Sequence, residues 1–192
     1  SAGRMAQECQ ADSESNPGLK LGAFMAENAL AGRDKVSLLT APEFSGLGMW
    51  VDQLLAESTG KNGKGLVPIT GEPTLAPDQY GNDRQFVVFE TGNTASQFER
   101  VSEDLEAAGH PVLTVRMPTS DRYDIAGEFF RWQFAIAIAA ALMGIYPFDQ
   151  PDVEAAKVKS RELLSHSATE FDTVDLTYAL NTVNAAQSPS YV

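Results

Sequence analysis

The stretch Lys35-Val-Ser-Leu-Leu-Thr40 decides the fold, because it has the pattern of a buried strand and a helix follows it directly. Apolar residues recur at helical spacing over residues 43–57, and Gly60 is typical of a helix end. Further strands are predicted at residues 85–90 and 111–116, each next to a predicted helix. Strands that alternate with helices favour an α/β fold, in which helices flank a parallel sheet.

The rest of the chain predicts more helices and one long connection. Asn16 is a good N-cap and Pro17 suits the first helical position, while Ser96 and Glu99 have capping-box spacing. Helices are expected at residues 4–11, 17–31, 96–108, 124–144, 151–164 and 175–186. The Gly/Pro-rich segment 60–83 is longer than most loops of compact domains, which is typical of a functional or a disordered segment.

Composition excludes several function classes. The 192 residues are 43% hydrophobic, enough for about one domain with a proper core. A net charge of -12 argues against a general nucleic-acid or membrane surface, because both are polyanions. The most apolar stretch, residues 134–145, is too short to span a bilayer. Cys9 is the only cysteine, which favours a reducing, cytoplasmic location, and the distant His110 and His166 predict no metal site.

Glu57 is placed where a helix does not favour a carboxylate. The last turn of a helix carries about half a negative charge, and this field makes a carboxylate there a better base. Gln53 lies four residues earlier and is therefore expected on the same helix face. An acid and an amide before a Gly-rich loop predict a binding or catalytic site, with a solvated helix end as the simpler alternative.

The position of this site within the fold depends on the loop after Glu57. Parallel sheets of this kind bind ligands beyond the carboxyl ends of their strands. Glu57 is predicted at the far end of the helix that follows the first strand, so it reaches that crevice only if the loop folds back. Lys61 and Lys64 in the loop are interpreted as residues that keep it soluble, with phosphate binding as the alternative.

Two sequence motifs carry the chemistry. The first is Gln53-Leu-Leu-Ala-Glu57-Ser-Thr-Gly-Lys61, and the second is Phe148-Asp-Gln150-Pro-Asp-Val-Glu-Ala-Ala-Lys157. Together they resemble the phosphoglucose isomerase family, which has a Gln four residues before its catalytic Glu, and a Phe-Asp-Gln…Val-Glu-x-x-Lys run near its C-terminal end. Both runs match in order and in internal spacing.

Other segments extend the resemblance over about residues 1–165. Asn16-Pro-Gly-Leu-Lys-Leu-Gly-Ala is similar to the helix before the family's strand, and Gly71-Glu72-Pro73 to its Gly-Glu-Pro turn. The sequence of residues 56–65 and 127–132 is most similar to the isomerase part of bifunctional transaldolase/phosphoglucose isomerases.

The resemblance implies the SIS (sugar isomerase) fold, a three-layer sandwich that occurs twice in each isomerase. Residues 1–165 would be the second, C-terminal copy, and residues 166–192 an extension or the start of a further segment. The chain would then be a fragment whose partners are the N-terminal SIS domain of the same parent, a sugar phosphate and, in a homodimer, a second copy. The implied reaction interconverts glucose 6-phosphate and fructose 6-phosphate through an enediol, without a cofactor.

The resemblance also assigns roles to single residues. Glu57 would shuttle a proton between C1 and C2 of the open-chain sugar, and Gln53 would line the same pocket. Gln150 would contact the phosphate side of the substrate, and Lys157 the ring and the C1-side oxygens. The family's phosphate-binding Ser/Thr loop and active-site Arg belong to the first copy. Its ring-opening His stands in a His-Gln-Gly run that does not occur in this sequence.

Simpler interpretations and other functions stay open at this point. Lys157 is also placed as a snorkelling lysine would be, and Gln150 as a helix cap. A non-catalytic, sugar-phosphate-binding SIS module is one alternative, and would make no use of Glu57 as a base. A dimerisation or assembly module that uses the helix at residues 125–145 is the other.

Overall fold

The structure is a computed structural model that describes residues 1–41, 44–91, 95–117, 122–165, 175, 177, 178 and 181. Its elements are α1 (Ala2–Glu8), α2 (Pro17–Leu30), β1 (Lys35–Thr40), α3 (Ser45–Thr59), β2 (Val67–Thr70), η2 (Pro77–Gln79), β3 (Arg84–Thr91), α4 (Ala95–Ala107), β4 (Val112–Met117), η3 (Arg122–Asp124), α5 (Ile125–Met143) and α6 (Pro151–Ser165). Two compact units divide the chain, Ser1–Pro151 and Asp152–Val192. His166 and most of the predicted helix 175–186 lie outside the described residues, and the predicted boundary at residue 165 stays a prediction.

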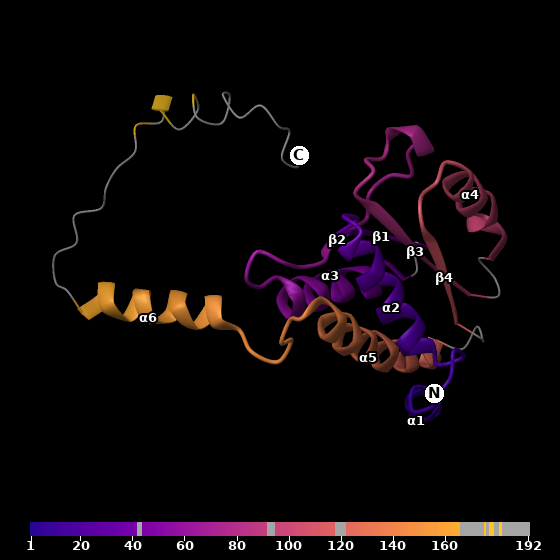
Figure 1. The fold of residues 1–192 in the computed structure, drawn as a ribbon, viewed down its shortest axis with the longest axis horizontal. Helices are drawn as coiled ribbons and strands as arrows, with labels where there is room; N and C mark the ends of the chain where they lie inside the picture. Colours follow the sequence, from indigo (N-terminus) through magenta and orange to yellow (C-terminus); the bar gives the residue numbers. More distant parts are fainter. Residues whose placement is uncertain are drawn as a thin grey trace. The chain divides into compact units, whose positions relative to one another are not determined.

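Four parallel strands form one sheet in the order β2-β1-β3-β4 (Figure 1). Lys35 at the start of β1 pairs with Val67 on one side and with Arg84 on the other. The α/β fold and the three predicted strands are confirmed. The prediction that residues 60–83 form only a connection is wrong, because it overlooks β2. Pro68 is tolerated in β2 because this strand is at the edge of the sheet.

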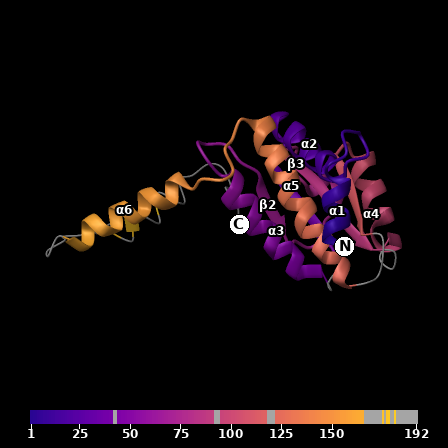
Figure 2. The same cartoon turned by 90° about the horizontal axis from the view of Figure 1, so that it is seen from below.

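Helices cover both faces of the sheet, which gives the three layers (Figures 1 and 2). Alternate residues of β1 separate the two cores: Val36 and Leu38 face one, and Leu39 faces the other. The larger core lies between the sheet and α2, α3 and α5, with α1 packed on α5. The smaller core holds Phe86 and Val88 of β3 against Phe98 and Leu105 of α4.

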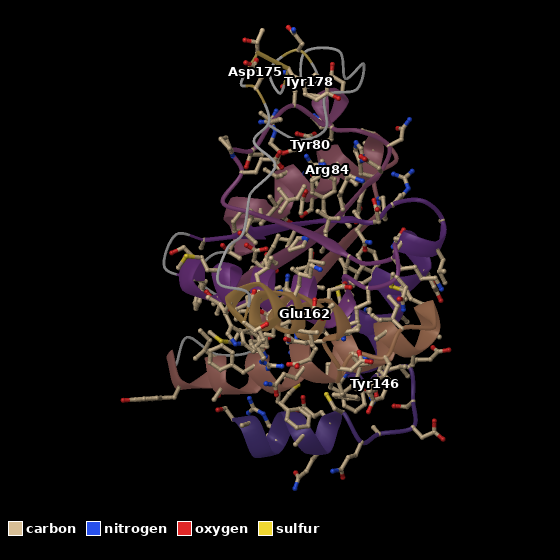
Figure 3. The ribbon with its side chains drawn as sticks, turned by 90° about the vertical axis from the view of Figure 1, so that its left-hand side faces the viewer. Tyr80, Arg84, Tyr146, Glu162, Asp175 and Tyr178 are labelled. Atoms are coloured by element: carbon tan, nitrogen blue, oxygen red, sulfur yellow. The ribbon has the colours of Figure 1, made fainter. Side chains whose placement is uncertain are left out.

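The long connection after β2 is ordered, which corrects the alternative of disorder for residues 60–83. Arg84 donates to both carboxylate oxygens of Glu72, at 3.0 and 3.2 Å. The guanidinium of Arg84 also lies 5.8 Å from the ring centre of Tyr80, and the two side chains lie together in Figure 3. Nε2 of the buried His110 bonds the carbonyl of Pro77 at 3.0 Å. These contacts hold residues 71–83 against the sheet.

Helix α5 is the core helix of the larger layer. By length and composition alone it could cross a membrane, with a mean hydropathy of 1.3. Within the first unit, however, Trp132, Ala135, Ile136 and Ala139 of this helix are buried in the larger core. Its apolar composition is therefore explained by burial against α2, α3 and the sheet.

Close approach of α2 to α5 gives the first testable prediction. A Cβ atom at Gly22 would meet the carbonyl oxygen of Ala135 and lie 2.8 Å from Cβ of Ile138. We expect Gly22→Ala to lower the free energy of unfolding by about 1–3 kcal/mol, because two helix backbones must separate. Gly46→Ala in α3 is the matched control, since a Cβ there meets nothing within 4 Å.

Urea denaturation of both glycine variants measures this difference. The control is expected to keep the stability of the native chain or to raise it by up to about 1 kcal/mol, because Ala favours helix over Gly. Equal stability of the Gly22 and Gly46 variants would contradict the close packing of α2 on α5.

Candidate functional site

The C-terminal half of α3 presents Gln53 and Glu57 on one face. This helix buries Val51 and Leu55 in the core, whereas Gln53 and Glu57 are exposed. Nε2 of Gln53 donates to Oε1 of Glu57 at 3.1 Å. The side chain of Thr59 closes the helix, because Oγ1 accepts from the backbone N–H of Leu66 at 2.8 Å. Gln53 and Glu57 are therefore hydrogen-bonded neighbours in the last two turns of α3.

A third predicted residue reaches the same carboxylate from a distant part of the chain. Nε2 of Gln150 donates to Oε2 of Glu57 at 3.3 Å, across 93 positions of sequence. Gln150 belongs to the irregular segment 144–150 that follows α5. Each carboxylate oxygen of Glu57 thus accepts a hydrogen bond from a different glutamine amide. The structure thus brings Gln150 of the second motif to Glu57 of the first motif.

A small polar cavity of about 280 Å³ lies at this carboxylate. Its lining residues are Trp50, Gln53, Leu54, Glu57, Ser58, Gln133 and Gln150. Three amides, a hydroxyl and a carboxylate offer hydrogen-bond donors and acceptors of the kind that hold a small polyol. The ring of Trp50 is fixed by an edge-to-face contact with Phe129, with centroids 4.7 Å apart.

Sequence reasoning missed Gln133 and Trp50 as cavity residues. Gln133 is an exposed polar residue within the apolar helix α5, and that contrast was the available signal. Trp50 lies on the α3 face whose apolar spacing predicts the helix, and that spacing indicates only an apolar position. In the structure it is only partly buried and lies between the cavity and Phe129.

The cavity lies away from the carboxyl ends of the strands, so the loop does not fold back to them. Helix α3 runs antiparallel to β1, and its last turn therefore lies near the amino ends of the strands. The chain then enters β2 at Val67, which pairs with Lys35, the first residue of β1. Glu57 therefore does not lie in the crevice expected at the carboxyl ends of β1 and β3.

Lys157 lies in the second unit of the chain, on α6. Its Nζ forms an ion pair with Oε1 of Glu154 at 2.7 Å, one helical turn earlier. Its predicted role beside the substrate stays a prediction. The residues that line the cavity include no lysine, arginine or histidine among those described.

The interpretation of Lys61 as a solubilising residue is wrong. Its side chain is 5% exposed, and its ammonium group bonds the carbonyl of Tyr146 at 2.9 Å. Lys64 is exposed, yet its Nζ donates to the carbonyl of Met143 at 3.1 Å, at the end of α5. Both lysines therefore connect the loop after α3 to the end of α5 and the segment that follows it.

No model of a known protein family matches the chain. Glucose-6-phosphate isomerase of Enterococcus faecalis is 27% identical over 156 residues, covering 63% of this chain and 35% of the relative. The enzyme of that name from Rubrobacter xylanophilus is 27% identical over 196 residues, covering 81% of this chain and 45% of the relative. The chain is a distant relative of these isomerases.

The glucose-6-phosphate isomerase of Lacticaseibacillus casei gives the same picture, at 27% identity over 73% of this chain. The chain spans 35%, 38% and 45% of the length of these three relatives. The crystal structure of a hypothetical protein from Thermus thermophilus superimposes with a TM-score of 0.67 at 20% identity. That match covers 86% of this chain and 49% of the other, and it supports the fold.

Proposed function

We propose that this chain is the C-terminal SIS domain of a glucose-6-phosphate isomerase in which Glu57 is the proton-shuttling base. The observation that carries the proposal is the carboxylate of Glu57, held between the amides of Gln53 and Gln150 at a polar cavity. The distant relationship to glucose-6-phosphate isomerases supports the reaction class. The sequence of residues 56–65 and 127–132 supports an isomerase of the transaldolase-fused type.

The chemistry assigns a role to each residue. An aldose becomes a ketose when one base takes the proton from C2 and returns it to C1 of the open-chain sugar. Glu57 takes and returns that proton, and the two glutamines orient its carboxylate while their free amide atoms bond sugar hydroxyls. Lys157 stabilises the negative charge of the enediolate intermediate. The reaction moves protons and no electrons between substrate and protein, so it calls for no redox cofactor.

The remainder of the site comes, in this proposal, from the rest of a longer protein. The chain spans less than half of each relative named above, and the phosphate-binding loop and ring-opening group would lie in the part it does not span. The N-terminal SIS domain is the proposed intramolecular partner, with a second copy of the protein in a homodimer. The proposed compartment is the cytoplasm.

A coupled assay tests the proposed function. The full-length protein is mixed with fructose 6-phosphate, and glucose 6-phosphate is detected by NADPH production with glucose-6-phosphate dehydrogenase. Turnover is expected, with fructose 1-phosphate as the unreactive control because its phosphate blocks the reacting carbon. If the folded protein binds fructose 6-phosphate without turnover, the non-catalytic binding module replaces the isomerase.

A further inference from the structure

We infer that Lys61 is a positioning residue, which fixes the segment 146–149 so that Gln150 reaches Glu57. The inference rests on the proposed function only where it treats Glu57 as a base. The contact between Lys61 and the segment stands on the structure alone.

The ammonium group of Lys61 donates three hydrogen bonds to this segment. Its Nζ donates to the carbonyl of Tyr146 at 2.9 Å, to Oδ1 of Asp149 at 3.1 Å and to the carbonyl of Asp149. An ammonium group has three N–H donors, so all three find an acceptor. The side chain is 5% exposed, and a buried charge is tolerated only where it is paired and hydrogen-bonded. Lys61 is therefore a structural cation rather than a free ligand for phosphate.

The segment itself has little else to fix its backbone. Residues 146–149 have no regular secondary structure, and none of them is buried. The aromatic rings of Tyr146 and Phe148 contact each other but are 63% and 76% exposed, so they do not anchor the segment in the core. Figure 3 labels Tyr146, whose carbonyl is one of the acceptors for Lys61.

Lys61 is well placed to control the catalytic geometry. It follows Glu57 by four residues, and its backbone N–H bonds the carbonyls of Thr59 and Lys64, so it is rigidly joined to the end of α3. Gln150 follows Asp149 directly. The link from Lys61 to Asp149 and the contact from Gln150 to Glu57 are thus adjacent bridges between the same two segments. Breaking the first bridge frees the segment that carries the second.

The experiment compares Lys61→Met with Lys64→Met in the full-length protein. Lys64 is the matched control, because it lies in the same loop and its Nζ donates to the carbonyl of Met143 at the end of α5. Deuterium exchange is measured on peptides that cover residues 145–150, and kcat and KM on fructose 6-phosphate. Lys61→Met is expected to speed exchange in these peptides, because their backbone loses its bonds to Lys61. It is also expected to lower kcat/KM roughly 10–100-fold, because Gln150 is no longer held at Glu57. Lys64→Met is expected to leave residues 146–150 unchanged.

A double-mutant cycle with Gln150→Ala separates positioning from general damage. If Lys61 acts through Gln150, the variant that combines both changes loses no more activity than the single variant with the lower activity. Additive losses would overturn the inference, and so would unchanged exchange in Lys61→Met. Exchange that rises specifically in Lys61→Met, in a protein without isomerase activity, would support the positioning role while the proposed function fails.

Asp149→Ala is the second variant, in case Lys61→Met does not fold. The side chain of Asp149 is 52% exposed, so its removal disturbs no core and still breaks one bond to Lys61. Faster exchange at residues 146–150 and a smaller loss of kcat/KM are expected. Unchanged exchange in a folded Asp149→Ala protein would count against the inference.

Discussion

Glu57→Gln lowers the isomerisation rate of the full-length protein by a factor on the order of 10² or more, if Glu57 is the base. An amide cannot take the proton from C1 of fructose 6-phosphate, so the loss should appear in kcat. A glutamine has nearly the shape of a glutamate, and its amide can still bond the neighbouring Gln53 and Gln150. We therefore expect KM for fructose 6-phosphate to change by only a few-fold.

Gln133→Ala is the control for this prediction. Gln133 lines the same cavity from α5, but its side chain is not one of those that bond the carboxylate. Its removal should change kcat by much less than Glu57→Gln, while it tests the shape of the cavity. Coupled assays across a range of fructose 6-phosphate concentrations separate kcat from KM. A kcat for Glu57→Gln within a few-fold of the native value would remove Glu57 from the role of base.

Local sequence patterns predict helix α3, which carries Gln53 and Glu57, but they do not predict which distant residue bonds Glu57. The spacing of Val51 and Leu55 fixes which face of α3 is buried, and the face of Gln53 and Glu57 follows from it. The contact from Gln150 depends on how α5 and its following segment return to α3, and no local pattern contains that information. Only the resemblance of two ordered motifs placed these residues in one site.

Lys61 and β2 show two further limits of reading the sequence. A lysine in a Gly-rich loop is exposed on average, and the carbonyls that bury Lys61 lie 85 and 88 positions away. The strand Val67–Thr70 has four residues and contains a proline, so it resembles a loop until its pairing with β1 is known. In both cases the deciding partner is distant in sequence.

The buried charges of α5 were not predicted either. Trp132 is fully buried in the core. Glu128 and Arg131 are buried beside it, although charged residues are rarely buried. Oε1 of Glu128 lies 3.2 Å from Nη2 of Arg131. Glu128 Oε2, Arg131 Nε and Trp132 Nε1 have no hydrogen-bond partner within the described part of the chain. This cluster gives the protein a specific pH dependence.

Burial raises the pKa of Glu128 from 4.5 to about 7, with smaller contributions from Asp124 and Glu8, while Arg131 opposes the shift. Between pH 4.5 and pH 7 the folded state holds this proton and the unfolded state releases it. The free energy of unfolding contributed by Glu128 therefore falls as pH rises through this range, and it is constant above about pH 7. The full effect is on the order of 3 kcal/mol.

Urea denaturation at about pH 5 and about pH 8 measures this effect against the variant Glu128→Gln/Arg131→Met. Both residues are replaced because removing Glu128 alone would leave a buried guanidinium without its partner. Carboxylates elsewhere titrate in both proteins, so their contributions cancel in the difference between native chain and variant. From the lower to the higher pH, the free energy of unfolding of the native chain should fall by about 2–3 kcal/mol relative to that of the variant. A difference that does not change with pH would mean that the folded protein already holds Glu128 in its charged form at the lower pH, with Arg131 fully compensating for its burial.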